Sequence, residues 1–191
     1  EFIIRSSALN EDTVDASQAG KFESVGHVSG KENFFNAVGR VIDSFDDNNP
    51  GNQVLVQPML KDVKICGVAF TADPNTFGNY YVINYDVSGS TSSITSGTSS
   101  VDGSRLLYVF KGKENTGLED GMYKVCETLS GLEKLFGKDN LDVEFAINGS
   151  GKLFILQVRT LCIKECVTDY EKQKQELVRI ETKIKDSQYP K

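Results

Sequence analysis

The chain has 191 residues, of which 39% are hydrophobic, and its 27 acidic and 21 basic residues give a formal net charge of −6. This length predicts one large domain or two small lobes, and the acidic balance argues against a general basic patch for nucleic acid, although it leaves room for a local basic pocket. No apolar run approaches the ~20 residues of a membrane helix and no signal peptide opens the chain, so we expect a soluble cytoplasmic domain without nucleic-acid or membrane partners.

The first residues, Glu1 to Arg5, lack an initiating Met and already have the pattern of a strand. We therefore expect a piece of a longer polypeptide. The polar stretch 6–29 follows without strong periodicity. Ser29 and Glu32 then form a capping-box pattern. The helix that it starts has apolar residues at helical spacing, namely Phe34, Phe35, Val38, Val41, Ile42 and Phe45.

Pro50-Gly51 forms a turn, after which β-branched and aromatic runs predict strands over 54–59, 65–71, 80–85 and 106–110. Between the last two strands, 14 of the 18 residues from 87 to 104 are Ser, Thr or Gly. Such a composition predicts a loop or linker that is mobile without a ligand.

Thr116 and Glu119 form a second capping-box pattern, and Gly137 ends the helix that follows. Its apolar stripe consists of Met122, Val125, Leu129, Leu132 and Phe136. The charged stretch 164–191 has Tyr170, Leu177 and Ile184 at heptad spacing, which predicts a solvated helix that packs one narrow stripe on a neighbour.

The cysteines predict free thiols. Cys66, Cys126, Cys162 and Cys166 are scattered, and the closest pair has no second pair and no histidine nearby. A zinc site is therefore not expected.

Two strands over 141–147 and 153–159 flank Asn148-Gly149-Ser150-Gly151, a strong hairpin signal. If Ile147 pairs with Lys152, this pairing fixes which other residues of the two strands lie opposite each other, and opposite residues share a face of the sheet. One face then carries Asp142, Glu144, Gln157 and Arg159 together with Ala146, Leu153 and Ile155. The other face is an apolar core face of Val143, Phe145, Phe154, Leu156 and Val158.

The polar face has two interpretations. Carboxylate and amide oxygens suit Mg²⁺, and an arginine beside them suits a phosphate. An exposed sheet face with an ordinary carboxylate–arginine ion pair is the alternative, and geometry alone does not separate the two.

Four blocks of sequence decide between them. Phe2-Ile3-Ile4-Arg5-Ser6-Ser7-Ala8-Leu9-Asn10-Glu11-Asp12 and the segment Ala16 to Val25 resemble the opening motif of the ATP-grasp domain of phosphoenolpyruvate synthases and pyruvate phosphate dikinases. Val54 to Met59 and Gly67 to Pro74 resemble the next two blocks of that family, and Asp142-Val143-Glu144-Phe145 with Leu156-Gln157-Val158-Arg159 resembles its closing signature. Together they cover about residues 2 to 161.

The resemblance implies an α+β, ATP-grasp-like fold, with a mixed or antiparallel sheet and flanking helices, in which ATP lies in a cleft between lobes. It implies that Arg5 and Arg159 hold phosphate oxygens and act in catalysis. The loop around Gly20, Lys21 and Ser24 would close over the triphosphate with backbone N–H groups. Gln57 and Met59 would line the adenine pocket, and Glu144 and Gln157, with Asp142, would bind Mg²⁺.

Members of the family transfer a phosphoryl group from ATP to a histidine on a separate domain, giving AMP and phosphate overall, and then to a small acceptor such as pyruvate. The resemblance thus implies an ATP-dependent phosphotransferase whose partners are a phosphohistidine domain and an acceptor domain of the same polypeptide. We expect the chain to divide into three segments: 1–53 (the Arg-Ser-Ser segment and a helix), 54–162 (the lobe with adenine- and metal-binding strands) and 163–191 (a charged helix or linker).

Three departures leave alternatives open. The family also uses a lysine from an upstream lobe, which we expect this fragment to lack, so the isolated chain should have little turnover. His27 matches no phospho-acceptor motif and is expected to be exposed or capping. The segment 84–97 looks more like relatives such as the L-glutamine kinase of capsule modification. A small-molecule kinase of that kind, a non-catalytic nucleotide-binding module and a generic α+β domain are the other interpretations.

Overall fold

The computed structural model describes residues 1–8, 12–13, 16–17, 23–45, 49–87, 104–111, 117–161 and 169–186. Gly20, Lys21 and nearly all of the Ser/Thr/Gly-rich stretch 87–104 lie outside these residues, as do Cys162 and Cys166. The described elements, in chain order, are β1 (Phe2–Ser7), β2 (Asp12–Thr13), β3 (Ala16–Ser17), β4 (Ser24–Val28), α1 (Lys31–Asp43), β5 (Gln53–Pro58), β6 (Val63–Phe70), β7 (Tyr80–Asp86), β8 (Ser104–Phe110), α3 (Asp120–Phe136), β9 (Leu141–Asn148), β10 (Leu153–Thr160) and α4 (Tyr170–Asp186).

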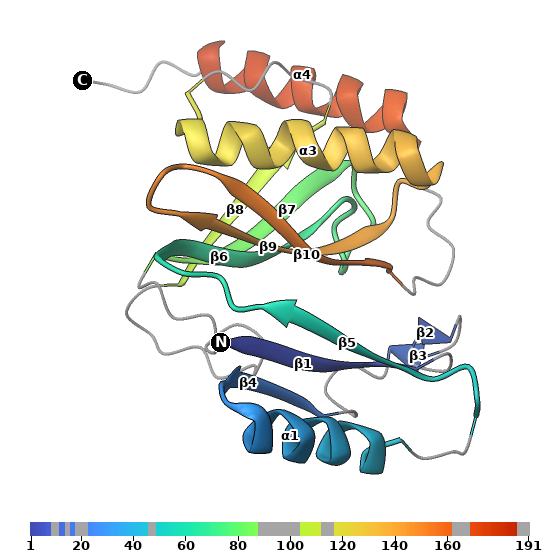
Figure 1. The fold of residues 1–191 in the computed structure, drawn as a ribbon. Coiled ribbons are helices and arrows are strands. Elements are labelled where there is room, and N and C mark those ends of the chain that lie inside the picture. Colours follow the sequence, from blue (N-terminus) through green and yellow to red (C-terminus); the bar gives the residue numbers. More distant parts are fainter. Residues whose placement is uncertain are drawn as a thin grey trace.

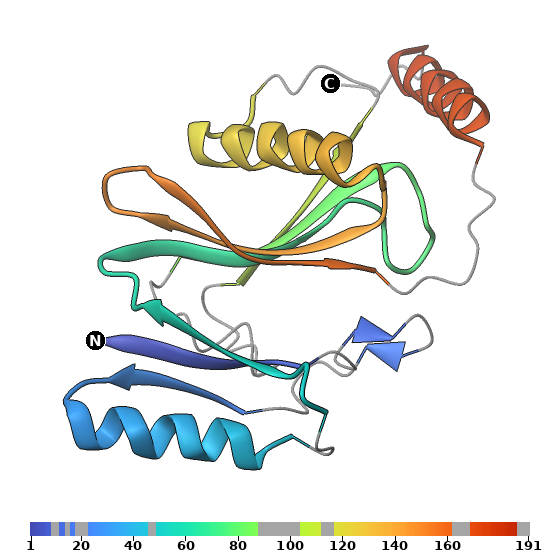
Figure 2. The same ribbon diagram turned by 45° about the vertical axis from the view of Figure 1, so that its right-hand side comes forward.

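The two larger sheets and two helices form four layers (Figure 1). A five-stranded antiparallel sheet, in the order β10-β9-β6-β7-β8, carries α3 on one face. A three-stranded antiparallel sheet, in the order β4-β1-β5, lies on the other side and carries α1 on its outer face. Figure 2 shows the same order of layers from a second direction. The α+β class that the sequence predicts is therefore confirmed.

We call residues 1–58 the N-terminal lobe and residues 63–161 the C-terminal lobe. The segment boundary expected after residue 53 falls at the start of β5, which pairs with β1 and thus belongs to the N-terminal lobe by strand pairing. The division into 1–53, 54–162 and 163–191 otherwise stays a prediction.

The N-terminal lobe is built around the alternation of β1. Ile4 is fully buried and packs with Ala37 and Val41 of α1. Because successive strand residues point to opposite faces, Arg5 points away from α1. The helix begins without the predicted capping box: Gly30, with φ 81°, is the N-cap, and no side chain makes a capping hydrogen bond.

The C-terminal lobe has a larger core between α3 and the five-stranded sheet. Ile83, Leu129, Val143 and Phe145 are at most 1% exposed there. The helix begins at Glu119 as N-cap, again without a side-chain capping bond, so the second capping-box prediction is wrong too. Gly137 ends the helix in the left-handed conformation, as predicted. Phe136 is 51% exposed and does not complete the predicted stripe.

The β9–β10 hairpin corrects the predicted register. Near the turn Leu153 pairs with Ile147, and a bulge at Leu156 then shifts the pairing so that Gln157 lies opposite Glu144 and Arg159 opposite Asp142. Leu153 packs against the core, whereas the predicted core residues Phe154 and Leu156 are only half-buried and lie outside that cluster. The four polar residues nevertheless share one face, as predicted.

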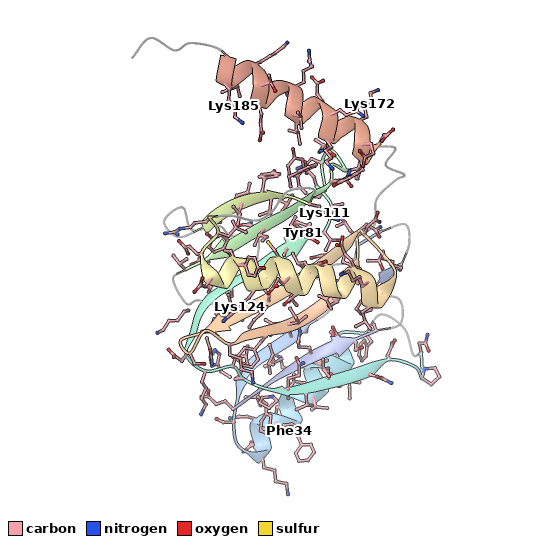
Figure 3. All side chains as sticks on the ribbon, turned by 90° about the horizontal axis from the view of Figure 1, so that it is seen from above. Phe34, Tyr81, Lys111, Lys124, Lys172 and Lys185 are labelled. Carbon is pink, nitrogen blue, oxygen red and sulfur yellow. The ribbon has the colours of Figure 1, made fainter. Side chains whose placement is uncertain are left out.

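The C-terminal helix α4 contacts the rest of the chain through its first turn. Tyr170 stacks on Phe110 at 6.0 Å between ring centroids, and the side chain of Gln173 accepts hydrogen bonds from the backbone and side-chain amides of Asn79. Figure 3 shows the helix beside the sheet, with Lys172 and Lys185 marking its two ends. Ile184, at the other end of the predicted stripe, is 60% exposed. None of the helices in the described ranges is both long and apolar enough to cross a membrane.

Candidate functional site: a polar network between the two sheets

Arg5 is positioned by its place on β1. On the three-stranded sheet it lies between Ser24 of β4 and Leu55 of β5, and all three share the face turned toward the five-stranded sheet. The neighbouring Ile4 is held in the core behind that face. The apolar anchoring of β1 to α1 thus directs the guanidinium of Arg5 across to the C-terminal lobe.

The guanidinium of Arg5 contacts two strands of the other sheet. Its Nη2 donates to Gln157 Oε1 at 2.8 Å and to Glu144 Oε2 at 3.3 Å. Arg5 is separated from Glu144 by 139 positions in the chain and from Gln157 by 152. The contact therefore joins the opening motif to the closing signature.

A second arginine completes the network from within the C-terminal lobe. Arg159 Nη2 lies 3.4 Å from Glu144 Oε1 and 3.7 Å from Asp142 Oδ2. Glu144 is therefore held by an arginine on each side, one from each sheet.

The network is partly shielded and balanced in charge. Its ionised side chains retain only 12–19% exposure. The charges of its two arginines, Arg5 and Arg159, and its two carboxylates, Glu144 and Asp142, cancel within the network. Because partial burial weakens the screening by water, each pair interacts more strongly here than it would on an open surface.

Three other predicted site residues, Ser24, Gln57 and Met59, lie on or next to the three-stranded sheet that carries Arg5. Ser24 is directly beside Arg5, and Gln57 pairs with Ile3 on the same face of the sheet. Met59 follows β5, where its backbone N–H donates to Glu1 O. Gly20 and Lys21 fall outside the described residues, so their predicted role over the triphosphate stays a prediction.

Sequence reasoning missed three apolar neighbours of the network. Leu55 shares the face of Arg5 and is 43% exposed, and Val68 and Phe70 of β6 lie directly opposite Glu144 and Asp142. The alternation of β5 carries a signal for Leu55, since it is two residues before Gln57 and must share its face. For Val68 and Phe70 no such signal exists, because the β6–β9 pairing is not local.

The donor set is of the kind that Mg²⁺ takes. That cation prefers one or two carboxylates, together with amide, water and phosphate oxygens. Asp142, Glu144 and Gln157 offer two carboxylates and an amide oxygen on one sheet face. Within the described ranges no three or more His, Cys, Asp or Glu side chains are grouped as metal ligands.

Other titratable groups belong to the scaffold. Glu133 of α3 accepts hydrogen bonds from Tyr81 Oη at 2.9 Å and from Lys111 Nζ at 2.5 Å, and Figure 3 shows Tyr81 and Lys111 next to each other. Burial, followed by the bond to Glu133, raises the pKa of Tyr81. His27 is 76% exposed and lies 3.9 Å from a carboxylate oxygen of Glu1, so it is exposed as expected.

Comparisons with known proteins identify the first part of the chain. Residues 1–107 match the family model described as the pyruvate phosphate dikinase AMP/ATP-binding domain. No match is found among curated proteins. The matched segment contains Arg5, Ser24 and Gln57, and the network joins it to β9 and β10 beyond the match. More than half of the chain lies in the matched segment, and the chain therefore belongs to the family of pyruvate phosphate dikinase AMP/ATP-binding domains.

Proposed function

We propose that the network between the sheets binds the phosphate groups of ATP together with Mg²⁺. In this proposal Arg5 and Arg159 hold phosphate oxygens, and Glu144 and Gln157, with Asp142, hold the cation. Gln57 and Met59 line the adenine pocket, while Ser24 and the loop with Gly20 and Lys21 cover the triphosphate. The observation that carries the proposal is the 2.8 Å contact from Arg5, in the ATP-binding family segment, to Gln157.

The chemistry of the residues supports this assignment. A guanidinium can donate to two phosphate oxygens at once, which a lysine cannot do. Bound Mg²⁺ would neutralise charge on the phosphates. Catalysis of phosphoryl transfer depends mostly on positioning and charge neutralisation, and two arginines from facing sheets are suited to both.

The chain would then be the ATP-binding part of a cytoplasmic multidomain phosphotransferase. It would pass a phosphoryl group from ATP to a histidine on another domain of the parent polypeptide, with AMP and phosphate as products overall, and from there to a small acceptor such as pyruvate. We expect the isolated chain to show little or no turnover, because His27 matches no phospho-acceptor motif.

Calorimetric titration of the purified chain with ATP, with and without MgCl₂, tests the binding step. We expect ATP to bind more tightly with Mg²⁺ than without it. Arg5→Gln should weaken binding roughly tenfold or more, since a hydrogen bond to a charged group contributes about 1.5–3 kcal/mol.

Arg40→Gln is the matched control, because Arg40 pairs with Glu23 inside the N-terminal lobe, away from the network. It should leave the affinity for ATP unchanged. Equal weakening by both substitutions, or wild-type affinity in Arg5→Gln, would contradict the assignment of the network as the phosphate site.

A further inference from the structure

The two lobes have separate apolar cores. The cluster behind β1 contains Ile4, Val28, Ala37 and Val41, and the cluster under α3 shares no residue with it. In the part of the chain that the structure describes, residues 59–62 between β5 and β6 join one lobe to the other. The described parts of the lobes are thus two packed bodies joined by this short segment.

Both ends of this connection are fixed by backbone hydrogen bonds. On one side Met59 N donates to Glu1 O of the N-terminal lobe at 3.1 Å. On the other, Asp62 O accepts from Gly149 N of the C-terminal lobe at 2.8 Å. Asp62 has φ 53°, and a Cβ at position 149 would overlap its carboxylate.

Between the two fixed points only Leu60 and Lys61 remain, in irregular backbone. A two-residue connection between anchored ends is the kind of short segment that absorbs the φ/ψ changes of domain motion. Rotation at 60–61 would leave both sheets intact.

Arg5 links the two lobes at a second place, separate from the connection at 59–62. Its bonds to Gln157 and Glu144 link β1 directly to β10 and β9. The same donors would be needed for phosphate oxygens, and the same carboxylate for a cation.

We propose that Arg5, Glu144 and Gln157 form a latch that closes the two lobes about a hinge at 60–61 in the nucleotide-free protein, and that a polyphosphate must break this latch to bind. The closing of the lobes does not depend on the proposed function. The competition with polyphosphate rests on it. The latch also predicts that removing the charge of Glu144 frees Arg5 for an anion.

Distance measurement by single-molecule energy transfer tests the closing. Bio-orthogonal labels at Asn36 of α1 and Glu127 of α3 report on the lobes, because both side chains are exposed and the two helices lie on opposite sides of the pair of sheets (Figure 1). Without nucleotide at low salt, Arg5→Ala should lower the mean transfer efficiency or broaden its distribution. Arg40→Ala, which breaks a pair inside the N-terminal lobe, should leave it unchanged.

Raising NaCl to about 1 M should shift the wild-type protein in the same direction as Arg5→Ala but to a smaller extent, because salt screens a largely shielded ion pair less than an exposed one. This arm needs no substitution and so does not depend on the folding of the variant. Identical distance distributions for wild type at both salt concentrations and for Arg5→Ala would overturn the latch.

Titration with inorganic tripolyphosphate, without a metal, tests the competition. Glu144→Gln should bind it roughly fivefold more tightly than the wild type, the upper end of what one partly exposed ion pair contributes. Unchanged or weaker binding would refute the competition. If Arg5→Ala opens the lobes but the wild type binds neither ATP nor tripolyphosphate, the latch stands and the proposed nucleotide function fails.

Discussion

Replacing Gly67 with alanine should destabilise the C-terminal lobe strongly. A Cβ at this position in β6 would overlap the backbone oxygen of Asn84 and would come within 2.9 Å of Phe145 Cε1 and of Tyr85 Cβ. None of these three neighbours can withdraw easily. Asn84 is paired in the β6–β7 ladder, Phe145 is 1% exposed in the core, and Tyr85 is buried as well.

The magnitude follows from these contacts. Overpacking of a core by one methyl group costs about 1–3 kcal/mol, and a clash with ladder backbone places Gly67→Ala at the upper end. For a cooperative unit the size of the C-terminal lobe, a loss of about 3 kcal/mol corresponds to a Tm of its transition lowered by about 12–24 °C.

Gly131→Ala is the matched control with the opposite sign. Gly131 lies inside α3 and is exposed, and a methyl group on its Cα would meet nothing within 4 Å. Alanine there should stabilise the helix by about 0.5–1 kcal/mol. Thermal unfolding followed by circular dichroism should place the wild type between the two variants. A Tm of Gly67→Ala equal to that of the wild type would refute the packing argument.

Three further predictions concern single residues. If the chain is part of a longer phosphotransferase, as we propose, Arg159→Lys in that enzyme should lower the rate of ATP-dependent phosphotransfer by roughly 10²–10³ while the circular dichroism spectrum stays unchanged; wild-type turnover would remove Arg159 from the site. Burial alone would raise the pKa of Asp73, but hydrogen bonds from Thr76 and Asn75 lower it overall. The ionised Asp73 thus stabilises the fold above its unfolded-state pKa of 3.8, and this stabilisation is lost as the pH falls through its lower folded-state pKa. Urea unfolding below about pH 4 should therefore show the free energy of unfolding of the wild type falling more steeply with pH than that of Asp73→Asn. Burial raises the pKa of the Cys126 thiol to about 11, so iodoacetamide at about pH 8 should modify it only after denaturation, as peptide mass spectrometry can show.

Strands were predicted well because their signal is local. The predicted runs at 54–59, 65–71, 80–85 and 106–110 correspond to β5 to β8 with ends shifted by at most two residues. Helix starts were less well predicted. Ser29 fits the capping-box pattern, but Gly30 takes a positive φ and itself becomes the N-cap. A short motif does not encode the direction from which the chain enters the helix.

The β9–β10 hairpin shows that an error in the predicted strand register moves side chains to the other face only where the shift is an odd number of residues. Around the site the pairing differs from the prediction by two residues, and a shift of two leaves every side chain on its predicted face. Near the turn the difference is one residue, so Leu153 moves to the core side and Phe154 leaves it. The bulge at Leu156 joins the two registers, and turn residues alone do not predict it.

The contact between Arg5 and Gln157 has no local signal at all. Strand periodicity places Arg5 on the face opposite Ile4, but it does not say which sheet lies opposite that face. The family resemblance alone grouped Arg5 with Glu144 and Gln157. The hinge at 60–61 and the close approach of Gly149 to Asp62 were not predicted, because both depend on the packing of the β9–β10 turn against the connection.

The separation of the two cores also bears on how the protein unfolds. Among the described residues, four buried hydrophobic side chains form the cluster behind β1, against thirteen in the cluster under α3. Buried apolar area sets most of the stability of a packed body, so the smaller cluster should melt first and heating should reveal two transitions instead of one. A ligand that contacts both sheets would bind only when both are folded, and by mass action it would draw the earlier transition toward the later one. The degree of cooperativity in the melting curve thus becomes a measure of occupancy between the sheets.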